Sequence, residues 1–293
     1  MGRTLSPELR RQARAIEFQA LKLVQDMMVG GRYRSRFRGQ GVQFSEHRQY
    51  VHGDDVRHIN WTLSARTRDP MVKQFEEERE LTIFLVLDIS KSTLFGTRNS
   101  TILDVIIQLA ALLAYAAVHS GDKIGLVMVP GGNKIIMPTK GQKAVHQIIC
   151  ALLSAEQSVG DTGQKLASLE RVMRGQRGIV CVLSDFLDTQ ALQKPLGRLS
   201  RAHDCMLVRL MDPRMRNVPP LGWMRFVDPE TGVLSWVDTG SSAFQKWHTK
   251  FITDWDKDFL KLGQKARTVD IDIGSDPVKA FIKFLQKKVY TRA

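Results

Sequence analysis

Hydrophobic and polar residues follow two alternating patterns along the chain from residue 81 onward. Short runs at 81–88, 123–129 and 178–185 are almost continuously apolar, which is typical of strands buried on both faces of a parallel sheet. Between these runs lie longer segments in which apolar residues have helical spacing, and Thr101–His119 is the most apolar of them. Strands that alternate with helices predict an α/β fold, with a mostly parallel, Rossmann-type sheet and helices on both faces.

The other elements predicted in this part follow the same two patterns. Further helices are predicted at Gln142–Ser154, 162–173, Gln190–Arg201, Ser242–Leu262 and Pro277–Lys288, and further strands at 204–212 and 266–273. One segment interrupts the alternation. Two short runs of alternating polarity flank the turn sequence DPETG, residues 228–232, and predict a hairpin inserted near Val218–Val237.

The first 80 residues have a different pattern. A helix is predicted from Ser6 to Val29, because Ser6 and the following proline suit a helix start and the glycines at 30–31 suit its end. Residues 32–80 are rich in Arg, Gly and Asp and have few long apolar runs, which is typical of short strands and turns. We therefore expect an N-terminal helix with a small β-rich extension at 1–80, and a larger domain at 81–293.

Composition places the chain among ordinary globular proteins. Of its 293 residues, 43% are hydrophobic and 25% are charged, and its three cysteines are far apart with no C-x-x-C pair. The first residues lack the apolar core of a secretory signal. Ile102–His119 is long enough to cross a membrane, but it contains Asp104 and Gln108 and is better explained as a helix buried against the sheet. We expect a soluble, cytoplasmic protein without a transmembrane span.

The formal net charge of +13 favours acidic partners, which include nucleic acid, anionic lipid and acidic protein surfaces. The segment Arg32–Arg38 interleaves arginines with Tyr33 and Phe37, a combination that can bind single-stranded nucleic acid. No nucleic-acid-reading fold is recognisable in the sequence. A solvated basic face, or a docking surface for an acidic protein, is therefore the preferred interpretation, and nucleic-acid binding is the less favoured one.

Oxygen-bearing side chains gather where the predicted strands end. Asp88 ends the run at 81–88 and is followed by Ser90 and Ser92, Asp185 ends the run at 178–185, and Thr162 lies in a loop between them. In an open parallel sheet, ligands bind beyond the carboxyl ends of the strands. We therefore expect Asp88, Ser90, Ser92, Thr162 and Asp185 to converge at one edge of the sheet.

Such a set of oxygen ligands suits a hard divalent cation, with Mg²⁺ first and Mn²⁺ or Ca²⁺ as alternatives. The two serine hydroxyls can bind the cation directly, and the two carboxylates can bind it directly or through water. The set contains no His or Cys, which argues against zinc. Because it brings few charges, the cation stays electrophilic and one coordination position is left for a carboxylate from a partner. This chemistry requires no nucleophile.

Two parts of the sequence resemble known families. Asp-x-Ser-x-Ser at 88–92, with Thr162 and Asp185, is similar to the metal-ion-dependent adhesion site of von Willebrand factor A domains. The segment GRYRSRFRGQGVQFSEHRQYVHGDDVRHINWTLSARTRDPMVKQFEEERE, residues 31–80, resembles the signature of the family called domain of unknown function 58, and the DPETG hairpin fits that family too. The resemblance extends over nearly the whole chain.

The resemblance implies a von Willebrand factor A-like fold and a function. Bacterial members of the family look like companions of MoxR-type AAA+ ATPases, which are thought to act in chaperone-like assembly. It therefore implies a non-enzymatic adaptor that binds such an ATPase, or a client protein that donates a carboxylate, through the cation. The chain has no G-x-x-x-x-G-K-[ST] loop, so ATP hydrolysis would belong to the partner. Many members carry transmembrane helices, which we do not predict here.

The same oxygen-bearing residues are also compatible with two roles that need no adhesion site, and the basic charge of the chain leaves one further alternative. Ser90 or Ser92 can simply cap a helix, although a cap accounts for only one of the clustered oxygens. A metal-dependent hydrolase or phosphatase could use Asp88 as a nucleophile, but Ser90 stands where such a phosphatase has its acid/base aspartate. A basic nucleic-acid-binding protein is the remaining alternative.

The segment 46–61 contains three histidines and two adjacent aspartates, but their spacing matches no zinc pattern. We expect a structural role instead. In that interpretation Asp54 and Asp55 pair with arginines such as Arg57 or Arg66, and Trp61 packs into the core.

Overall fold

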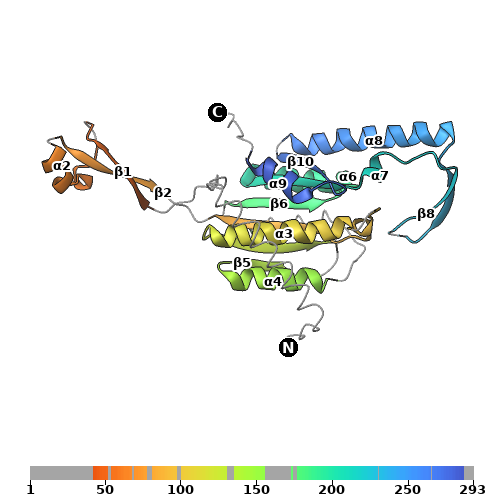
Figure 1. Ribbon diagram of the computed structural model, residues 1–293, viewed down its shortest axis with the longest axis horizontal. Helices are drawn as coiled ribbons and strands as arrows, with labels where there is room; N and C mark the ends of the chain where they lie inside the picture. The colour runs from red at the N-terminus through yellow and green to blue at the C-terminus, as the bar shows by residue number, and fades with distance from the viewer. Residues whose placement is uncertain are drawn as a thin grey trace. The chain divides into compact units, whose positions relative to one another are not determined.

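The structure is a computed structural model, and most of the chain from residue 42 onward can be described. The described residues are 42–51, 54–67, 69–77, 81–97, 100–130, 135–155, 173, 177–229, 231–264 and 266–286. Residues 35–81 form one compact unit, and the residues from Thr82 onward belong to a second (Figure 1). The helix predicted at Ser6–Val29 lies outside the described residues, as does most of the one predicted at 162–173.

The smaller unit is built on an antiparallel pair of strands, β1 (Val42–Gln49) and β2 (Met71–Glu77). The connection between them contains the 3-10 helix η1 (Val56–His58) and the short helix α2 (Trp61–Thr67). A single β-bridge from Ile59 to Val72 ties this connection back to β2. The unit is therefore a hairpin whose long loop folds against one of its own strands.

The larger unit is built on a six-stranded sheet in the order β10-β7-β6-β3-β4-β5. Its strands are β3 (Thr82–Asp88), β4 (Lys123–Val129), β5 (Ile135–Thr139), β6 (Ile179–Ser184), β7 (Asp204–Met211) and β10 (Arg267–Asp272). Every neighbouring pair is parallel except β4 and β5, which are antiparallel. The predicted mixed α/β fold with a mostly parallel sheet is confirmed.

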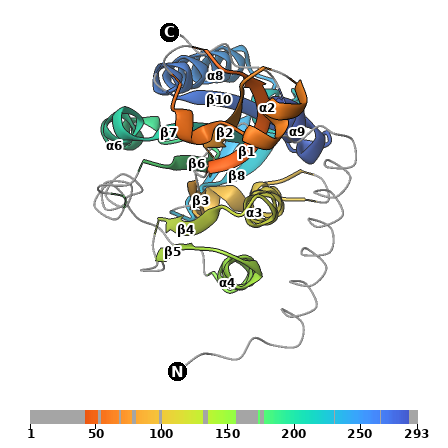
Figure 2. The same cartoon turned by 90° about the vertical axis from the view of Figure 1, so that its left-hand side faces the viewer.

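Helices cover both faces of this sheet. Figure 2, viewed along the strands, shows one group of helices on one side of the sheet and a second group on the other. The first side carries α3 (Ile102–His119), α4 (Gln142–Leu153) and α9 (Pro277–Gln286). The second side carries α6 (Thr189–Ala202) and α8 (Ser242–Gly263). Side chains from β3, β4, β6 and β7 pack against α6 and α8 in one apolar cluster that includes Phe84, Val182 and Phe259.

Helix α3 is buried at the centre of the first side. Thr101 and Asp104 form a capping box at its start, in which each side chain accepts a hydrogen bond from the other residue's backbone N–H. Among the described helices, α3 alone is long and apolar enough to cross a membrane, but 72% of it is buried inside the protein. Burial against the sheet therefore accounts for its apolar composition.

A second hairpin extends from the larger unit after the short helix α7 (Pro213–Arg216). Its strands are β8 (Trp223–Val227) and β9 (Leu234–Asp238), which pair with each other and not with the main sheet. Gly232, in the turn, has a φ of 74°, a conformation that favours glycine. Helix α8 begins directly after this hairpin, with Ser241 as its N-cap.

Candidate metal centre

The centre of the candidate site is the pair of strands β3 and β6, which are adjacent and parallel and therefore end at the same edge of the sheet. Leu87 lies opposite Leu183, so the next residues, Asp88 and Ser184, are also side by side. The Ser184 hydroxyl donates a 2.6 Å hydrogen bond to Asp88 Oδ2. Two segments that are 96 residues apart in sequence are joined here by side chains.

The loop after β3 folds back on Asp88. The backbone N–H of Ser90 donates to Asp88 Oδ1 at 2.9 Å, and Ser90 then begins the 3-10 helix η2 (Lys91–Leu94). The hydroxyl of the buried Thr93 donates to the carbonyl oxygen of Ser90 at 2.7 Å. This tight turn brings the Ser90 and Ser92 hydroxyls into a mutual hydrogen bond of 2.8 Å, in which either oxygen can be the donor. The expected meeting of Asp88, Ser90 and Ser92 is present.

Asp185 follows Ser184 directly and is almost completely buried, at 2% exposure. Its Oδ1 accepts a hydrogen bond from the N–H of Leu187. Between them, Phe186 has a positive φ of 54°, which is unfavourable for a bulky residue and marks a strained turn. Two contacts hold Phe186 in place. Trp255 Nε1–H donates a 2.7 Å hydrogen bond to the carbonyl oxygen of Phe186, and the Phe186 ring packs on the Phe259 ring. Helix α8 therefore supports the loop that carries Asp185.

The electrostatics of the site follow from burial. Desolvation raises the pKa of the Asp88 carboxyl, and the hydrogen bonds from Ser184 and Ser90 offset part of that effect. A buried carboxylate is costly without a compensating charge. No group of three or more His, Cys, Asp or Glu side chains that could hold a metal occurs in the described part of the chain. A cation at this edge would depend on serine hydroxyls as well as on carboxylates.

The geometry of these oxygens fits a small cation. Octahedral Mg²⁺ has ligands at about 2.0–2.1 Å, so two adjacent ligand oxygens are separated by about 2.9 Å. The Ser90 and Ser92 hydroxyl oxygens are 2.8 Å apart. Hydroxyl and carboxylate oxygens are also the ligand types that hard cations take. Four of the five predicted ligands can be located at this edge, and the fifth, Thr162, lies outside the described residues.

Two residues at this edge were not among the predicted ligands. Ser184 contacts Asp88 directly, and only the pairing of β3 with β6 shows this. Asp212, which follows β7 and is 1% exposed, accepts hydrogen bonds from the N–H and the hydroxyl of Thr97, each at 2.8 Å. It therefore anchors the far end of the loop that carries Ser90 and Ser92. The sequence offered one sign of this residue: Asp212 ends the apolar run at 204–212, as Asp88 and Asp185 end theirs.

The histidine- and aspartate-rich segment of the smaller unit contains ion pairs. Asp55 pairs with Arg57, as predicted, and this contact lowers the pKa of Asp55 to about 2. Asp54 pairs with Arg48 through two hydrogen bonds of 2.8 and 2.7 Å, instead of with Arg57 or Arg66. The expectation for Trp61 was wrong: it is 69% exposed, and no residue of α2 is buried, so the type of a residue did not decide its burial here.

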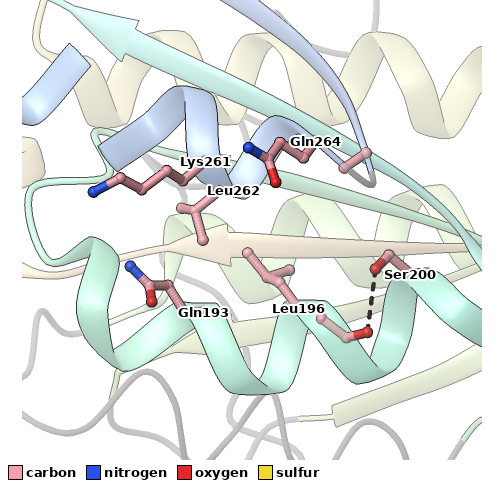
Figure 3. Close-up of a pocket in the computed structure, with 8 residues that line it drawn as sticks. Gln193, Leu196, Ser200, Lys261, Leu262 and Gln264 are labelled. Atoms are coloured by element: carbon pink, nitrogen blue, oxygen red, sulfur yellow. Dashed lines mark hydrogen bonds between the residues drawn. The ribbon is translucent and has the colours of Figure 1, made fainter. Parts of the chain in front are cut away.

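A pocket of about 190 Å³ lies between α6 and α8 at the opposite, amino-terminal edge of the sheet (Figure 3). It is lined by Gln193, Leu196, Gly197, Ser200, Lys261, Leu262, Gln264 and Ala266. The Lys261 ammonium donates a hydrogen bond to Asp258 Oδ1, and the Ser200 hydroxyl donates one to the carbonyl oxygen of Gly197 in the same helix. Ligand pockets are usually larger than about 300 Å³ and contain convergent polar groups. This pocket is therefore not the candidate site.

Several known proteins are similar to this chain. Uncharacterized proteins of Mycobacterium bovis and Mycobacterium tuberculosis are each 29% identical to it over 233 residues, which cover 78% of this chain and 73% of the relative. An uncharacterized protein of Mycobacterium avium is 35% identical over 74 residues, or 25% of this chain and 43% of the relative.

Among solved structures, the conserved hypothetical protein BatB from Bacteroides thetaiotaomicron aligns with a TM-score of 0.42 and 14% identity, over 70% of this chain and 97% of that one. An aerotolerance-related membrane protein from Bacteroides fragilis aligns with a TM-score of 0.43 and 15% identity, over 71% and 100%. The family model described as protein of unknown function DUF58 matches residues 46–256. That match spans most of the sequence, and the chain belongs to this family.

Proposed function

We propose that the chain is a non-enzymatic protein-binding module that holds a divalent cation at the carboxyl edge of β3 and β6, in the manner of a von Willebrand factor A adhesion site. The proposed ligands are Asp88, Ser90, Ser92, Thr162 and Asp185. Mg²⁺ is the proposed cation, and Mn²⁺ or Ca²⁺ could replace it. The observation that carries the proposal is the pair of serine hydroxyls, 2.8 Å apart, beside a buried carboxylate.

Each described residue has a separate role in this proposal. Ser90 and Ser92 supply neutral hydroxyl ligands. Asp88 supplies negative charge and also orients the loop, because its Oδ1 holds the N–H of Ser90. Asp185 supplies the second negative charge. When bound, the cation provides an electrophilic position that a partner's carboxylate can occupy. The mostly parallel sheet with helices on both faces supports the von Willebrand factor A-like interpretation of the fold.

The proposed partner is a MoxR-type AAA+ ATPase, or a client protein of it, and the proposed process is assembly or maturation of protein complexes in the cytoplasm. This part of the proposal comes from the resemblance of residues 31–80 and 88–92 to the family's motifs. The net charge of +13 supports an acidic partner surface.

Titration calorimetry with MgCl₂, together with spectroscopic titration with Mn²⁺, tests the cation site. The Ser92→Ala variant should lose about ten-fold or more in affinity, because one ligand oxygen is removed. Ser200→Ala is the matched control, since the Ser200 hydroxyl bonds only within its own helix at Gly197. A Ser92→Ala variant that binds Mg²⁺ as well as the unaltered protein would contradict the proposed site.

Capture of the purified MoxR-type ATPase encoded in the same genome tests the partner. Binding should require Mg²⁺, should be lost in EDTA and should be weakened by Asp88→Ala and Ser92→Ala. Capture that is independent of metal and unchanged in both variants would contradict the adhesion mechanism. Metal binding without capture of the ATPase would contradict the choice of partner and leave the cation site standing.

A further inference from the structure

The β8–β9 hairpin has two unlike faces. Side chains that lie opposite each other on paired strands point to the same face. The pairs Trp223–Asp238, Arg225–Trp236 and Val227–Leu234 therefore share one face, and the intervening pairs Met224–Val237 and Phe226–Ser235 share the other. On the second face, the Phe226 ring contacts Phe244 of α8, and Met224 and Val237 are partly covered. The first face is the outer one.

The outer face is strongly apolar although it is exposed. Trp223 is 71% exposed, Trp236 65%, Leu234 57% and Val227 54%. The largest apolar patch on a typical monomeric protein is about 300–600 Å² and often has a function. With about 150–250 Å² for a whole Trp and about 100 Å² for a whole Val or Leu, these four side chains expose roughly 400 Å². This face is therefore as large as the largest apolar patch of a typical monomer, the kind of patch that often serves as an interaction site.

The polar residues of the same face have opposite charges. Arg225 lies at the centre between the two tryptophans, and Asp238 lies one cross-strand pair away. The ion pairs found among the described residues include neither side chain, and Asp238 Oδ1 accepts a hydrogen bond from the backbone N–H of Gly240. A surface that contains both a cation and an anion around an apolar centre is complementary to itself. Self-complementarity is the requirement for a two-fold symmetric interface.

We propose that a second copy of this chain covers the outer face of the hairpin. A two-fold axis along the hairpin lays β8 of one copy over β9 of the other. Arg225 of each copy then stacks on Trp236 of the other, next to the carboxylate of its Asp238, and the aliphatic side chains near the turn meet. Arginine on a tryptophan face is a favourable cation–π contact. Trp and Arg are also the residues that contribute most binding energy in interfaces.

The area agrees with this occupant. Two copies together bury roughly 800 Å² from the four apolar side chains, and Arg225 and Asp238 on the same face add to this area. The total is at the low end of specific interfaces, about 1,200 Å² or less, which predicts a weak dimer. An anionic membrane is the less suitable occupant. The turn sequence between the strands contains Asp228 and Glu230, which anionic headgroups would repel.

Sedimentation velocity over about 1 to 100 µM protein tests the proposal, because a dissociation constant in this range matches a small interface. The unaltered protein should form dimers, and Trp236→Ser should raise the dissociation constant about 100-fold or more. Trp247→Ser is the matched control, because Trp247 on α8 is 60% exposed but does not belong to the hairpin. Exposed tryptophans can be replaced without loss of the core, so circular dichroism should be unchanged in both.

Charge reversal provides the second test. Arg225→Asp and Asp238→Arg should each abolish the dimer. The double variant should dimerise more tightly than either single variant but less tightly than the unaltered protein, because it restores the opposite charges and not the stacking of Arg225 on Trp236. Dimerisation should persist in EDTA, so the result of this test does not depend on whether the proposed cation site exists. A protein that stays monomeric at every concentration would overturn the proposal, as would a monomer that sediments with phosphatidylglycerol vesicles. A double variant that dimerises no better than either single variant would overturn the proposed pairing.

Discussion

Arg209 offers a quantitative test of how this fold accommodates a buried charge. The residue lies in the apolar strand β7 and is 2% exposed. Its guanidinium donates to both oxygens of Asp270 on β10, at 2.7 and 2.9 Å, and to Asp256 on α8 at 2.7 Å. It also stacks on the rings of Trp255 and Phe259, with centroid distances of 4.7 and 4.3 Å.

The cost of breaking this network depends on which charge is left behind. Asp256 and Asp270 are 31% and 46% exposed, so they can be rehydrated when the arginine is removed. Arg209→Met keeps the packing volume and should lower the free energy of unfolding by about 2–3 kcal/mol, below the 3–5 kcal/mol typical of a broken buried pair. Removing both carboxylates leaves a buried, unpaired cation and should cost about 4–5 kcal/mol.

Urea unfolding followed by circular dichroism measures these differences. The variants are Arg209→Met, the double variant Asp256→Ala with Asp270→Ala, and the triple variant that combines all three changes. The triple variant should be more stable than the double variant by about 2 kcal/mol, because it no longer contains the unpaired cation. The loss of the Arg216–Asp256 contact is common to the double and triple variants and cancels in that comparison.

The opposite order of stability would refute this reasoning. If Arg209→Met were more destabilising than the loss of both carboxylates, the stacking of the guanidinium on Trp255 and Phe259 would outweigh its ion pairs. If the triple variant were no more stable than the double variant, the buried charge would carry no measurable penalty. Either result would show that desolvation of Arg209 does not dominate the energetics at this position.

Three further predictions concern other parts of the fold. Burial raises the pKa of Cys205 to about 12, so its thiol should resist iodoacetamide in the native protein at pH 8 and at pH 9. The half-buried Cys150 should react under the same conditions. Mass spectrometry of the labelled peptides measures both, and modification of Cys205 would contradict the prediction. Asp212→Asn should weaken Mg²⁺ binding about ten-fold, because it weakens the hydrogen bonds from Thr97 that hold the loop carrying Ser90 and Ser92. An unchanged Mg²⁺ affinity in titration calorimetry would show that Asp212 does not position this loop. Gly178→Ala should destabilise the protein by about 2–3 kcal/mol in thermal or urea unfolding, because the new Cβ would lie 2.5 Å from the carbonyl oxygen of Thr82. Gly197→Ala on α6 is the control and should be neutral or stabilising, because no atom lies within 4 Å of its Cβ position. Equal effects of the two substitutions would contradict the steric argument.

The order of strands and helices in the larger unit was predictable because each element has a local signature. The run that becomes β3 is continuously apolar, and all seven of its residues are buried, as a central parallel strand requires. The helix predicted at Thr101–His119 is α3, and the capping box of Thr101 and Asp104 that begins it depends only on residues three positions apart. The turn that joins Asp88, Ser90 and Ser92 is local in the same sense, so its contribution to the candidate site could be predicted from spacing alone.

Contacts between distant segments were decided only by the tertiary structure. The bond from Ser184 to Asp88 depends on β6 lying next to β3, and the Thr97–Asp212 contact joins residues that are 115 positions apart. Trp61 looked like a core residue by its type, but its side chain is exposed in the structure. Composition and spacing therefore determined the elements and the chemistry of the loop after β3. Strand order determined which polar groups meet, because register across a sheet is a property of the whole assembly of strands and not of any one segment.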